Sequence, residues 1–263
     1  MSTQLLTQLN LKEQLSMEMA INNFQLIEAK SLNGKLQVVE ENKVFKELQG
    51  YLKAEFGKEV TILEHKGIEY DILNDRAEKA EVHYLLDTNS NIRLLFGLAT
   101  NKEGKTFETA TVDMIVEENG HHYIKMVSYD VETKQFVVTY SEKIQQDVEA
   151  AWVNMLSTGD RPFEALKAEP EMYKAKGFFD FCLPGGYKWC GQGCGKATGG
   201  GALKNKIDGC CFIHDDCYDK YSSNRCANCD KSFVSCISNR TNYATDPATA
   251  SAIIIFFQTK CYF

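Results

Sequence analysis

Asp208-Gly-Cys-Cys-Phe-Ile-His-Asp-Asp-Cys-Tyr218 is the stretch on which the fold depends, because it places cysteines around a histidine and a pair of carboxylates. Cys210 and Cys217 are seven residues apart, which in a helix is about two turns or 10.5 Å. Cys229 and Cys236 repeat this interval. If both segments are helices packed antiparallel, the disulfides Cys217–Cys229 and Cys210–Cys236 can form together, since each needs Cα atoms roughly 4.4–6.8 Å apart.

Two such disulfides would fix the surroundings of His214, which lies between them on the first segment. Asp230 is the neighbour of Cys229 and would be brought toward the imidazole. A buried histidine with a carboxylate on one ring nitrogen and a free second nitrogen is the arrangement of a general base. The spacing therefore predicts a catalytic pair of His214 and Asp230.

The pattern Cys-Cys-x-x-His-Asp-x-Cys-Tyr, from Cys210 to Tyr218, resembles the active-site helix of the secreted phospholipases A2. Tyr187-Lys-Trp-Cys-Gly-Gln-Gly-Cys-Gly195 is similar to the calcium-binding loop of that family, and Cys229-Asp230 to its Cys-Asp pair. Cys182-Leu-Pro-Gly-Gly-Tyr187 also resembles the viral capsid phospholipase domains. The resemblance covers about Leu183 to Arg240 and implies a small, disulfide-rich α-helical domain.

The resemblance implies calcium-dependent hydrolysis of the sn-2 ester of phospholipids. His214 would take a proton from the attacking water, Asp230 would hold the imidazole, and Tyr218 would donate a hydrogen bond to Asp230. Calcium would polarise the ester carbonyl and stabilise the developing oxyanion. Its ligands would be the carbonyls of Trp189, Gly191 and Gly193 and the carboxylate of Asp215.

The resemblance also implies a disulfide between Cys190 and Cys211. The remaining four cysteines, Cys182, Cys194, Cys226 and Cys261, could pair in three ways, and the sequence does not rank them. Cys194 stands where the animal enzymes usually have glycine, and the interval from Cys190 to His214 is a few residues longer than theirs. These departures leave the register of the calcium loop open.

Composition divides the chain in two. All ten cysteines lie between Cys182 and Cys261, and the net charge is +3 from Lys176 onward against −10 before it. Chains of this length commonly hold one or two domains. We predict an acidic α+β pro- or carrier domain over residues 1–156, a linker over 157–176 and the phospholipase A2-like domain over 177–263.

The N-terminal part is predicted to fold as helices on an antiparallel sheet, an arrangement that is cystatin-like by analogy alone. Helical periodicity covers the Leu-rich opening within residues 1–37, Val39–Phe56 and Glu142–Leu156. Alternation predicts strands over Ile68–Ile72, Ile92–Leu98, Phe107–Glu118, His121–Tyr129 and Phe136–Tyr140, with a hairpin turn at Asn119-Gly120.

We interpret His65 and His83 as isolated structural residues. His121 and His122 would point to opposite faces of a strand and not share a metal. The apolar run Ala248–Phe257 is expected to be a buried helix or strand.

An even number of cysteines indicates a disulfide framework for an oxidising compartment. The first residues carry no secretory signal pattern, so we expect secretion or surface display by a dedicated route. No stretch has the eighteen or so apolar residues of a membrane span, and the acidic N-terminal part disfavours nucleic acid. The expected partner is a phospholipid membrane surface, and the N-terminal domain is expected to cover the enzyme until the linker is cut near Lys174 or Lys176.

Two alternatives stay open. Cys190, Cys194, Cys226 and Cys229 with His214 could form a zinc framework, although the adjacency of Cys210 and Cys211 suits disulfides better. The chain could also be a non-catalytic, disulfide-stapled membrane-active toxin released from a precursor. In the catalytic interpretation it is a secreted bacterial toxin or antimicrobial precursor.

Overall fold

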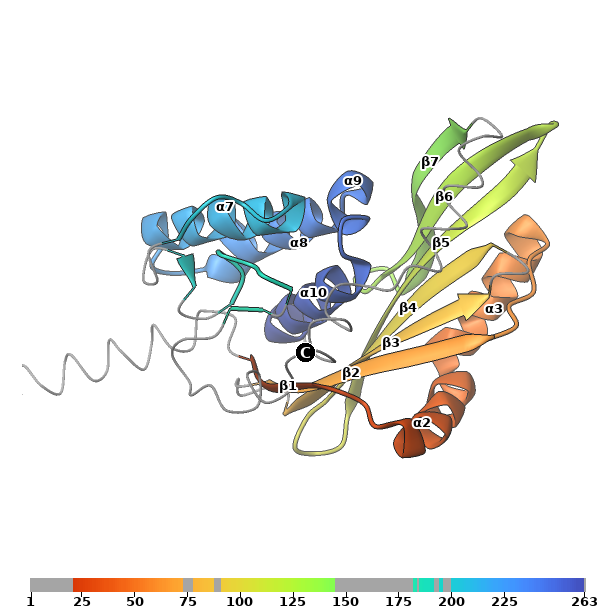
Figure 1. The fold of residues 1–263 in the computed structure, drawn as a ribbon, viewed down its shortest axis with the longest axis horizontal. Coiled ribbons are helices and arrows are strands. Elements are labelled where there is room, and N and C mark those ends of the chain that lie inside the picture. Colours follow the sequence, from red (N-terminus) through yellow and green to blue (C-terminus); the bar gives the residue numbers. More distant parts are fainter. Residues whose placement is uncertain are drawn as a thin grey trace, which may run out of the picture.

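The structure is a computed structural model that describes residues 21–72, 78–87, 91–144, 182–183, 185–191, 194–195 and 200–262. Its centre is a seven-stranded antiparallel sheet in which the strands follow their order in the chain. Helices α2 (Ala29–Glu41) and α3 (Lys43–Phe56) cover one face of this sheet, and the C-terminal helices lie against the other (Figure 1). The sheet thus separates two layers of helix.

The strands are β1 (Ile21–Leu26), β2 (Glu64–Ile72), β3 (Lys79–Asp87), β4 (Ile92–Thr100), β5 (Thr106–Glu118), β6 (His121–Asp130) and β7 (Gln135–Ile144). Successive side chains of a strand point to opposite faces. On β4, Leu94 and Phe96 therefore join the core with α3, whereas Leu95 and Ala99 join the core on the other face. Apolar residues on both faces give the sheet two hydrophobic cores.

Several boundaries differ from those predicted. Val39–Phe56 is not one helix, because Asn42 is extended (φ −64°, ψ 139°) and its side chain accepts hydrogen bonds from the N–H groups of Val44 and Phe45. An asparagine in this position is a strong N-cap and starts a new helix. The expected helix over Glu142–Leu156 is wrong at its start, since β7 continues to Ile144. Residues 145–176 lie outside the described residues.

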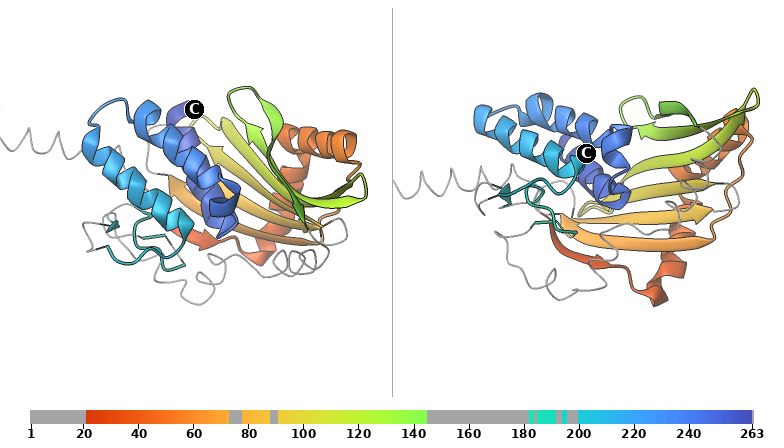
Figure 2. Two further views of the ribbon diagram at one scale, coloured as in Figure 1. Left: turned by 90° about the horizontal axis from the view of Figure 1, so that it is seen from above. Right: turned by 45° about the horizontal axis from the view of Figure 1, so that its top comes forward.

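The C-terminal part is helical, as predicted. It consists of α7 (Lys206–Lys220), the π-helical turn η2 (Cys226–Asp230), α8 (Lys231–Ser238), α9 (Arg240–Tyr243) and α10 (Pro247–Tyr262). Helix α10 lies between the sheet and α8, and two further views show the same layering (Figure 2). It contains the apolar run Ala248–Phe257, all of which is buried. None of the helices in the described part of the chain is both long and apolar enough to cross a bilayer.

Contact between α10 and the sheet is close. A Cβ atom on Gly97 of β4 would come within 2.9 Å of the Ile255 side chain, so a residue without a side chain lets the helix approach. The Tyr70 hydroxyl of β2 also donates a hydrogen bond to the carbonyl of Ala252, 2.9 Å away. The sheet and the disulfide-rich helices therefore share one hydrophobic core.

The two histidines that we interpreted as isolated lie together on neighbouring strands. His65 Nε2 is 3.0 Å from His83 Nδ1, and His83 Nε2 is 3.2 Å from a carboxylate oxygen of Glu81. Burial, together with the neighbouring His83, lowers the pKa of His65 to about 4. The interpretation of these residues as isolated was wrong.

This pair should make the fold sensitive to acid. The unfolded chain binds a proton at His65 near pH 6.5, whereas the folded chain binds it only near pH 4. The free energy of unfolding should therefore decrease as the pH falls through this window. We expect His65→Gln to reduce the decrease, measured by urea unfolding at several pH values. Identical pH dependence in the variant and the natural chain would contradict this role.

Candidate active site

Helix α7 presents His214 to the carboxylate of Asp230, which ends the π-helical turn η2. His214 Nε2 lies 2.8 Å from Asp230 Oδ1, and the Tyr218 hydroxyl donates a 2.5 Å hydrogen bond to the same oxygen. Tyr218 reaches this oxygen because it follows His214 by about one helical turn. His214 and Asp230 are 7% and 1% exposed. All three residues predicted for this site are thus brought together.

Aromatic rings enclose the imidazole. Phe233 of α8 stacks on it at 4.2 Å between ring centroids, and Phe257 of α10 meets it edge-on at 4.9 Å. None of the described residues is seen to hydrogen-bond with Nδ1 of His214. The ring is therefore held by one nitrogen and by its faces, and its second nitrogen can meet a water molecule.

A lysine that we did not predict completes the cluster. Lys260 Nζ of α10 lies 3.0 Å from Asp230 Oδ2 and 2.5 Å from the Tyr218 hydroxyl. The neighbouring Cys261 is joined by a disulfide to Cys226 of η2, which fixes this end of α10 beside His214 and Asp230. The only feature of the sequence that could have indicated this role is the position of Lys260, a single lysine just after an apolar run.

Burial sets the protonation of the site. It lowers the pKa of His214 below the ordinary 6.5, because the loss of hydration outweighs the hydrogen bond that the ring donates to Asp230. Burial alone would raise the pKa of Asp230, but hydrogen bonds from His214 and Tyr218 and the charge of Lys260 keep it below the ordinary 3.8. Near neutral pH the site holds a neutral imidazole against a carboxylate.

Both disulfides predicted from the equal spacing are present, with Cα–Cα distances of 5.9 Å for Cys210–Cys236 and 5.8 Å for Cys217–Cys229. The pair implied by the resemblance, Cys190–Cys211, is present as well. The four cysteines left open pair as Cys182–Cys194 and Cys226–Cys261.

With every cysteine in a disulfide, the zinc framework has no thiolate ligands. Potential ligand atoms of Cys226, Asp230 and Cys261 do lie within 4.8 Å of one another. The two sulfurs are bonded to each other, however, and Asp230 is engaged by His214, Tyr218 and Lys260. This group therefore belongs to the histidine site rather than to a separate metal centre.

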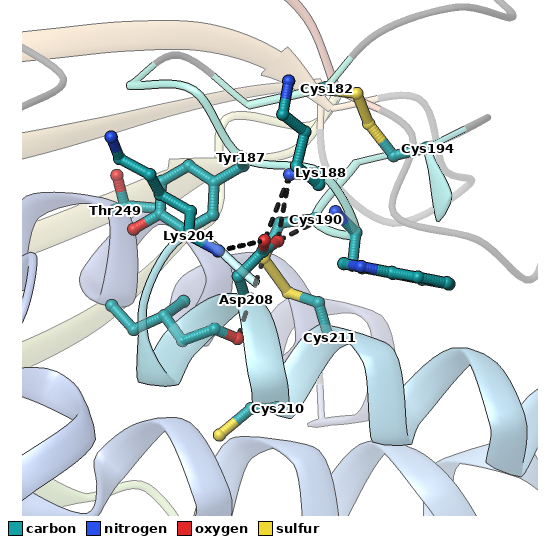
Figure 3. The surroundings of a disulfide bond; sticks show 12 residues. Cys182, Tyr187, Lys188, Cys190, Cys194, Lys204, Asp208, Cys210, Cys211 and Thr249 are labelled. Atoms are coloured by element: carbon teal, nitrogen blue, oxygen red, sulfur yellow. Dashed lines mark hydrogen bonds between the residues drawn. A yellow bond between two sulfur atoms is a disulfide. The ribbon is translucent and has the colours of Figure 1, made fainter. Parts of the chain in front are cut away.

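Asp208, in the first turn of α7, orders the loop that precedes the helix. Its buried carboxylate accepts hydrogen bonds from the backbone N–H groups of Lys188 (3.1 Å), Trp189 (2.8 Å) and Lys204 (2.9 Å) (Figure 3). Its own N–H donates to the side chain of Asn205, the N-cap of α7. One carboxylate thus joins both ends of the loop to α7, a role that we did not predict.

Replacing Asp208 should loosen this loop. Asp208→Ala leaves three backbone N–H groups without their acceptor, and each charge-assisted bond contributes on the order of 1.5–3 kcal/mol. We expect the free energy of unfolding to fall by about 3 kcal/mol. Asp216→Ala is the matched control, since Asp216 lies on the same helix and pairs with Lys220 at the surface. Equal losses in both variants, measured by urea unfolding, would contradict this role.

The predicted calcium ligands are only partly described. Gly193 lies outside the described residues. Gly191 adopts φ 123°, and its carbonyl accepts a hydrogen bond from the Cys194 N–H. Asp215 Oδ2 lies 2.9 Å from where a Cβ on Gly195 would be, so its carboxylate faces the loop. A carboxylate and backbone carbonyls are the hard oxygen donors that suit calcium.

An apolar surface lies beside the site. Leu203, Phe212 and Ile213 are 53%, 41% and 63% exposed. Leu203 lies over Gly209 of α7, one turn before Ile213, and Phe212 packs edge-on against Trp189 at 4.7 Å. The exposed lysines nearby in the loop and at the helix start are Lys188, Lys204 and Lys206. The loop before α7 and the start of the helix therefore place exposed lysines near these apolar side chains.

Comparison of the chain with protein-family models, with curated proteins and with solved structures gives no match. Neither a family nor an activity is therefore assigned to the chain by similarity. The functional proposal below depends on the geometry of the histidine site and on the motif around it.

Proposed function

We propose that the chain is a calcium-dependent phospholipase A2-type hydrolase. The observation that carries the proposal is the state of His214, a buried imidazole whose pKa is lowered and whose Nε2 is bonded to Asp230. A neutral imidazole held in this way can accept a proton on Nδ1. The sequence motif supports an ester of a phospholipid as the substrate.

In this proposal His214 takes a proton from a water molecule as the water oxygen attacks the sn-2 carbonyl carbon. The imidazolium is stabilised by the Asp230 carboxylate, which Tyr218 and Lys260 orient. When the bond from the carbonyl carbon to the glycerol oxygen breaks, His214 returns the proton to that oxygen. The products are a fatty acid and a lysophospholipid, and the histidine is regenerated.

In this proposal calcium would be held by oxygen donors, with Asp215 as the charged ligand and the carbonyls of Trp189, Gly191 and Gly193 as the others. Bound calcium would supply a Lewis acid that favours the negatively charged oxygen of the ester. Asp208 would preserve the loop for this role, because it bonds the N–H groups and leaves carbonyls available.

The apolar and basic surface beside the site supports a phospholipid membrane as the partner. Exposed apolar side chains can enter the boundary region of a bilayer, and each lysine near an anionic surface contributes about 1 kcal/mol. Five disulfides are consistent with an oxidising compartment, and we propose that the protein acts outside the cell. The same surface would also serve a membrane-active protein without catalysis, which is the second candidate.

The N-terminal part was expected to mask the enzyme. Its described strands support α10, whose other contacts include α8, while Phe212 and Ile213 stay exposed. This placement favours a supporting role for the sheet. Masking by residues 1–156 remains a prediction.

The test is release of fatty acid from phosphatidylglycerol vesicles with calcium or with a calcium chelator. We expect release only with calcium. Asp215→Asn should raise the calcium concentration needed for half of the maximal rate by about tenfold or more. Asp216→Asn is the matched control on the same helix and should leave this concentration unchanged. Equal release with the chelator would overturn the calcium-dependent proposal.

A further inference from the structure

A pocket of about 270 Å³ lies between the β6–β7 hairpin and the helices α8 and α10. Its sheet wall includes Val131 and Val137, and its helix wall includes Val234 and Phe257. Asp230 also lines it, although His214 is not among its described lining residues. The pocket therefore lies next to Asp230, but the imidazole of His214 does not face it.

The deeper end of this pocket is polar. A smaller cavity of about 40 Å³ adjoins it and shares Ser128, Ser238 and Gln258 with it. The hydroxyls of Thr109 and Thr111 line this cavity. Gln258 Oε1 is buried there and has no hydrogen-bond partner among the described residues. A buried acceptor without a donor is costly to the fold, so a ligand that supplies a donor would be stabilised.

Charge around the pocket disfavours anions. Two of its carboxylates are neutralised, since Glu132 pairs with Lys231 at 2.9 Å and Asp230 pairs with Lys260 at 3.0 Å. Asp130, a third acidic residue of the lining, accepts hydrogen bonds from backbone N–H groups of the hairpin turn. An uncharged ligand therefore fits better than a carboxylate.

We propose that this pocket binds a small uncharged aliphatic alcohol, whose hydroxyl donates to Gln258 Oε1 and whose chain lies against Val131, Val137 and Val234. The volume of about 270 Å³ equals roughly nine water molecules of about 30 Å³ each. A chain of about eight carbons matches this size. Binding of this alcohol goes beyond the proposed hydrolase activity and does not depend on it.

The experiment titrates the full-length protein with 1-octanol and follows the methyl NMR signals of Val131, Val137 and Val234. We expect saturable shifts of these signals. Octyl methyl ether lacks the donor, and octanoate carries a negative charge. Each should bind about tenfold more weakly, because one hydrogen bond to a buried acceptor contributes about 1.4 kcal/mol and this corresponds to a factor of ten. Absence of saturable shifts with octanol would overturn the proposal.

Variants of the lining residues distinguish binding in this pocket from nonspecific binding of alcohols elsewhere on the protein. Gln258→Leu should abolish the preference for octanol over its methyl ether. Val137→Trp should fill the pocket and abolish the shifts, and it is tolerable because Val137 is 37% exposed on the edge strand β7. Val138→Trp is the matched control, since Val138 is the exposed neighbour and does not line the pocket. Equal octanol affinity in Val137→Trp and Val138→Trp would also overturn the proposal.

Discussion

His214→Gln is expected to abolish the calcium-dependent release of fatty acid from phosphatidylglycerol vesicles. Glutamine can fill much of the space of the imidazole and can hydrogen-bond to Asp230, but it cannot accept a proton from water. General-base catalysis contributes on the order of 10²–10⁴-fold, so the rate should fall by about a thousandfold. As the pH falls below 6.5, the natural chain should keep the proposed activity until the lowered pKa of His214 is reached.

The controls for this prediction concern the fold and the second candidate. The thermal midpoint of His214→Gln should stay near that of the natural chain, because the disulfides on either side remain. His122→Gln is the matched substitution, since His122 lies on β6, away from the disulfide-rich helices. A membrane-active protein without catalysis would be favoured by a different result. In that case neither the natural chain nor His214→Gln would release fatty acid, and both would make vesicles leak.

Cutting the backbone within residues 157–176 is expected to leave the two parts of the chain bound to each other. No disulfide joins them, because all five pairs lie between Cys182 and Cys261. The contact between α10 and the sheet should hold them, since each fully buried isoleucine or phenylalanine contributes about 1.5–3 kcal/mol. After cleavage at an engineered protease site, size-exclusion chromatography should show one species of the intact mass.

Gly97→Val should weaken this complex, since the added side chain would meet Ile255 and Thr109, each within 2.9 Å of the first added carbon. Gly50→Val is the control, because a Cβ at Gly50 meets nothing within 4 Å. After cleavage, the first variant should dissociate at lower urea concentration than the second. Immediate separation of the natural chain into two soluble monomers would instead support two independent domains.

The local chemistry of the site could be predicted because it depends on intervals within the chain. The interval of seven residues shared by Cys210–Cys217 and Cys229–Cys236 fixed how two helices pair. Asn119-Gly120 likewise marked the hairpin between β5 and β6, with both residues at positive φ. Such signals depend on residues that are close in the sequence, so they can be recognised without knowledge of the tertiary structure.

The features that the sequence missed or left undecided depend on contacts between distant segments. Strand β3 was not predicted, because its buried residues run from Val82 to Asp87 without alternation where both faces are covered. Helix α10 is apolar on every side, so its sequence has no period that separates helix from strand. The role of Asp208 was hidden because its partners are backbone N–H groups, which every loop possesses.

The helical periodicity also misled at Asn42. The apolar stripe of Val44, Leu48 and Leu52 predicted a single helix that began at Val39 and ran through Asn42. The structure has two helices there because the side chain of Asn42 competes for the backbone N–H groups that follow it. The periodicity of apolar residues indicates which face of a helix is buried. The residue where the helix starts depends instead on the N-cap side chain.

Confinement of every cysteine to residues 182–261 has a consequence for the assembly of the molecule. The sheet with α2 and α3 contains no cysteine and can acquire its hydrogen-bonded ladder in a reducing environment. Its free face would then offer a preformed template on which α10 can dock, bringing Cys261 toward Cys226 before any oxidant is met. Maturation of such a protein would need an oxidant only for the part that contains the cysteines.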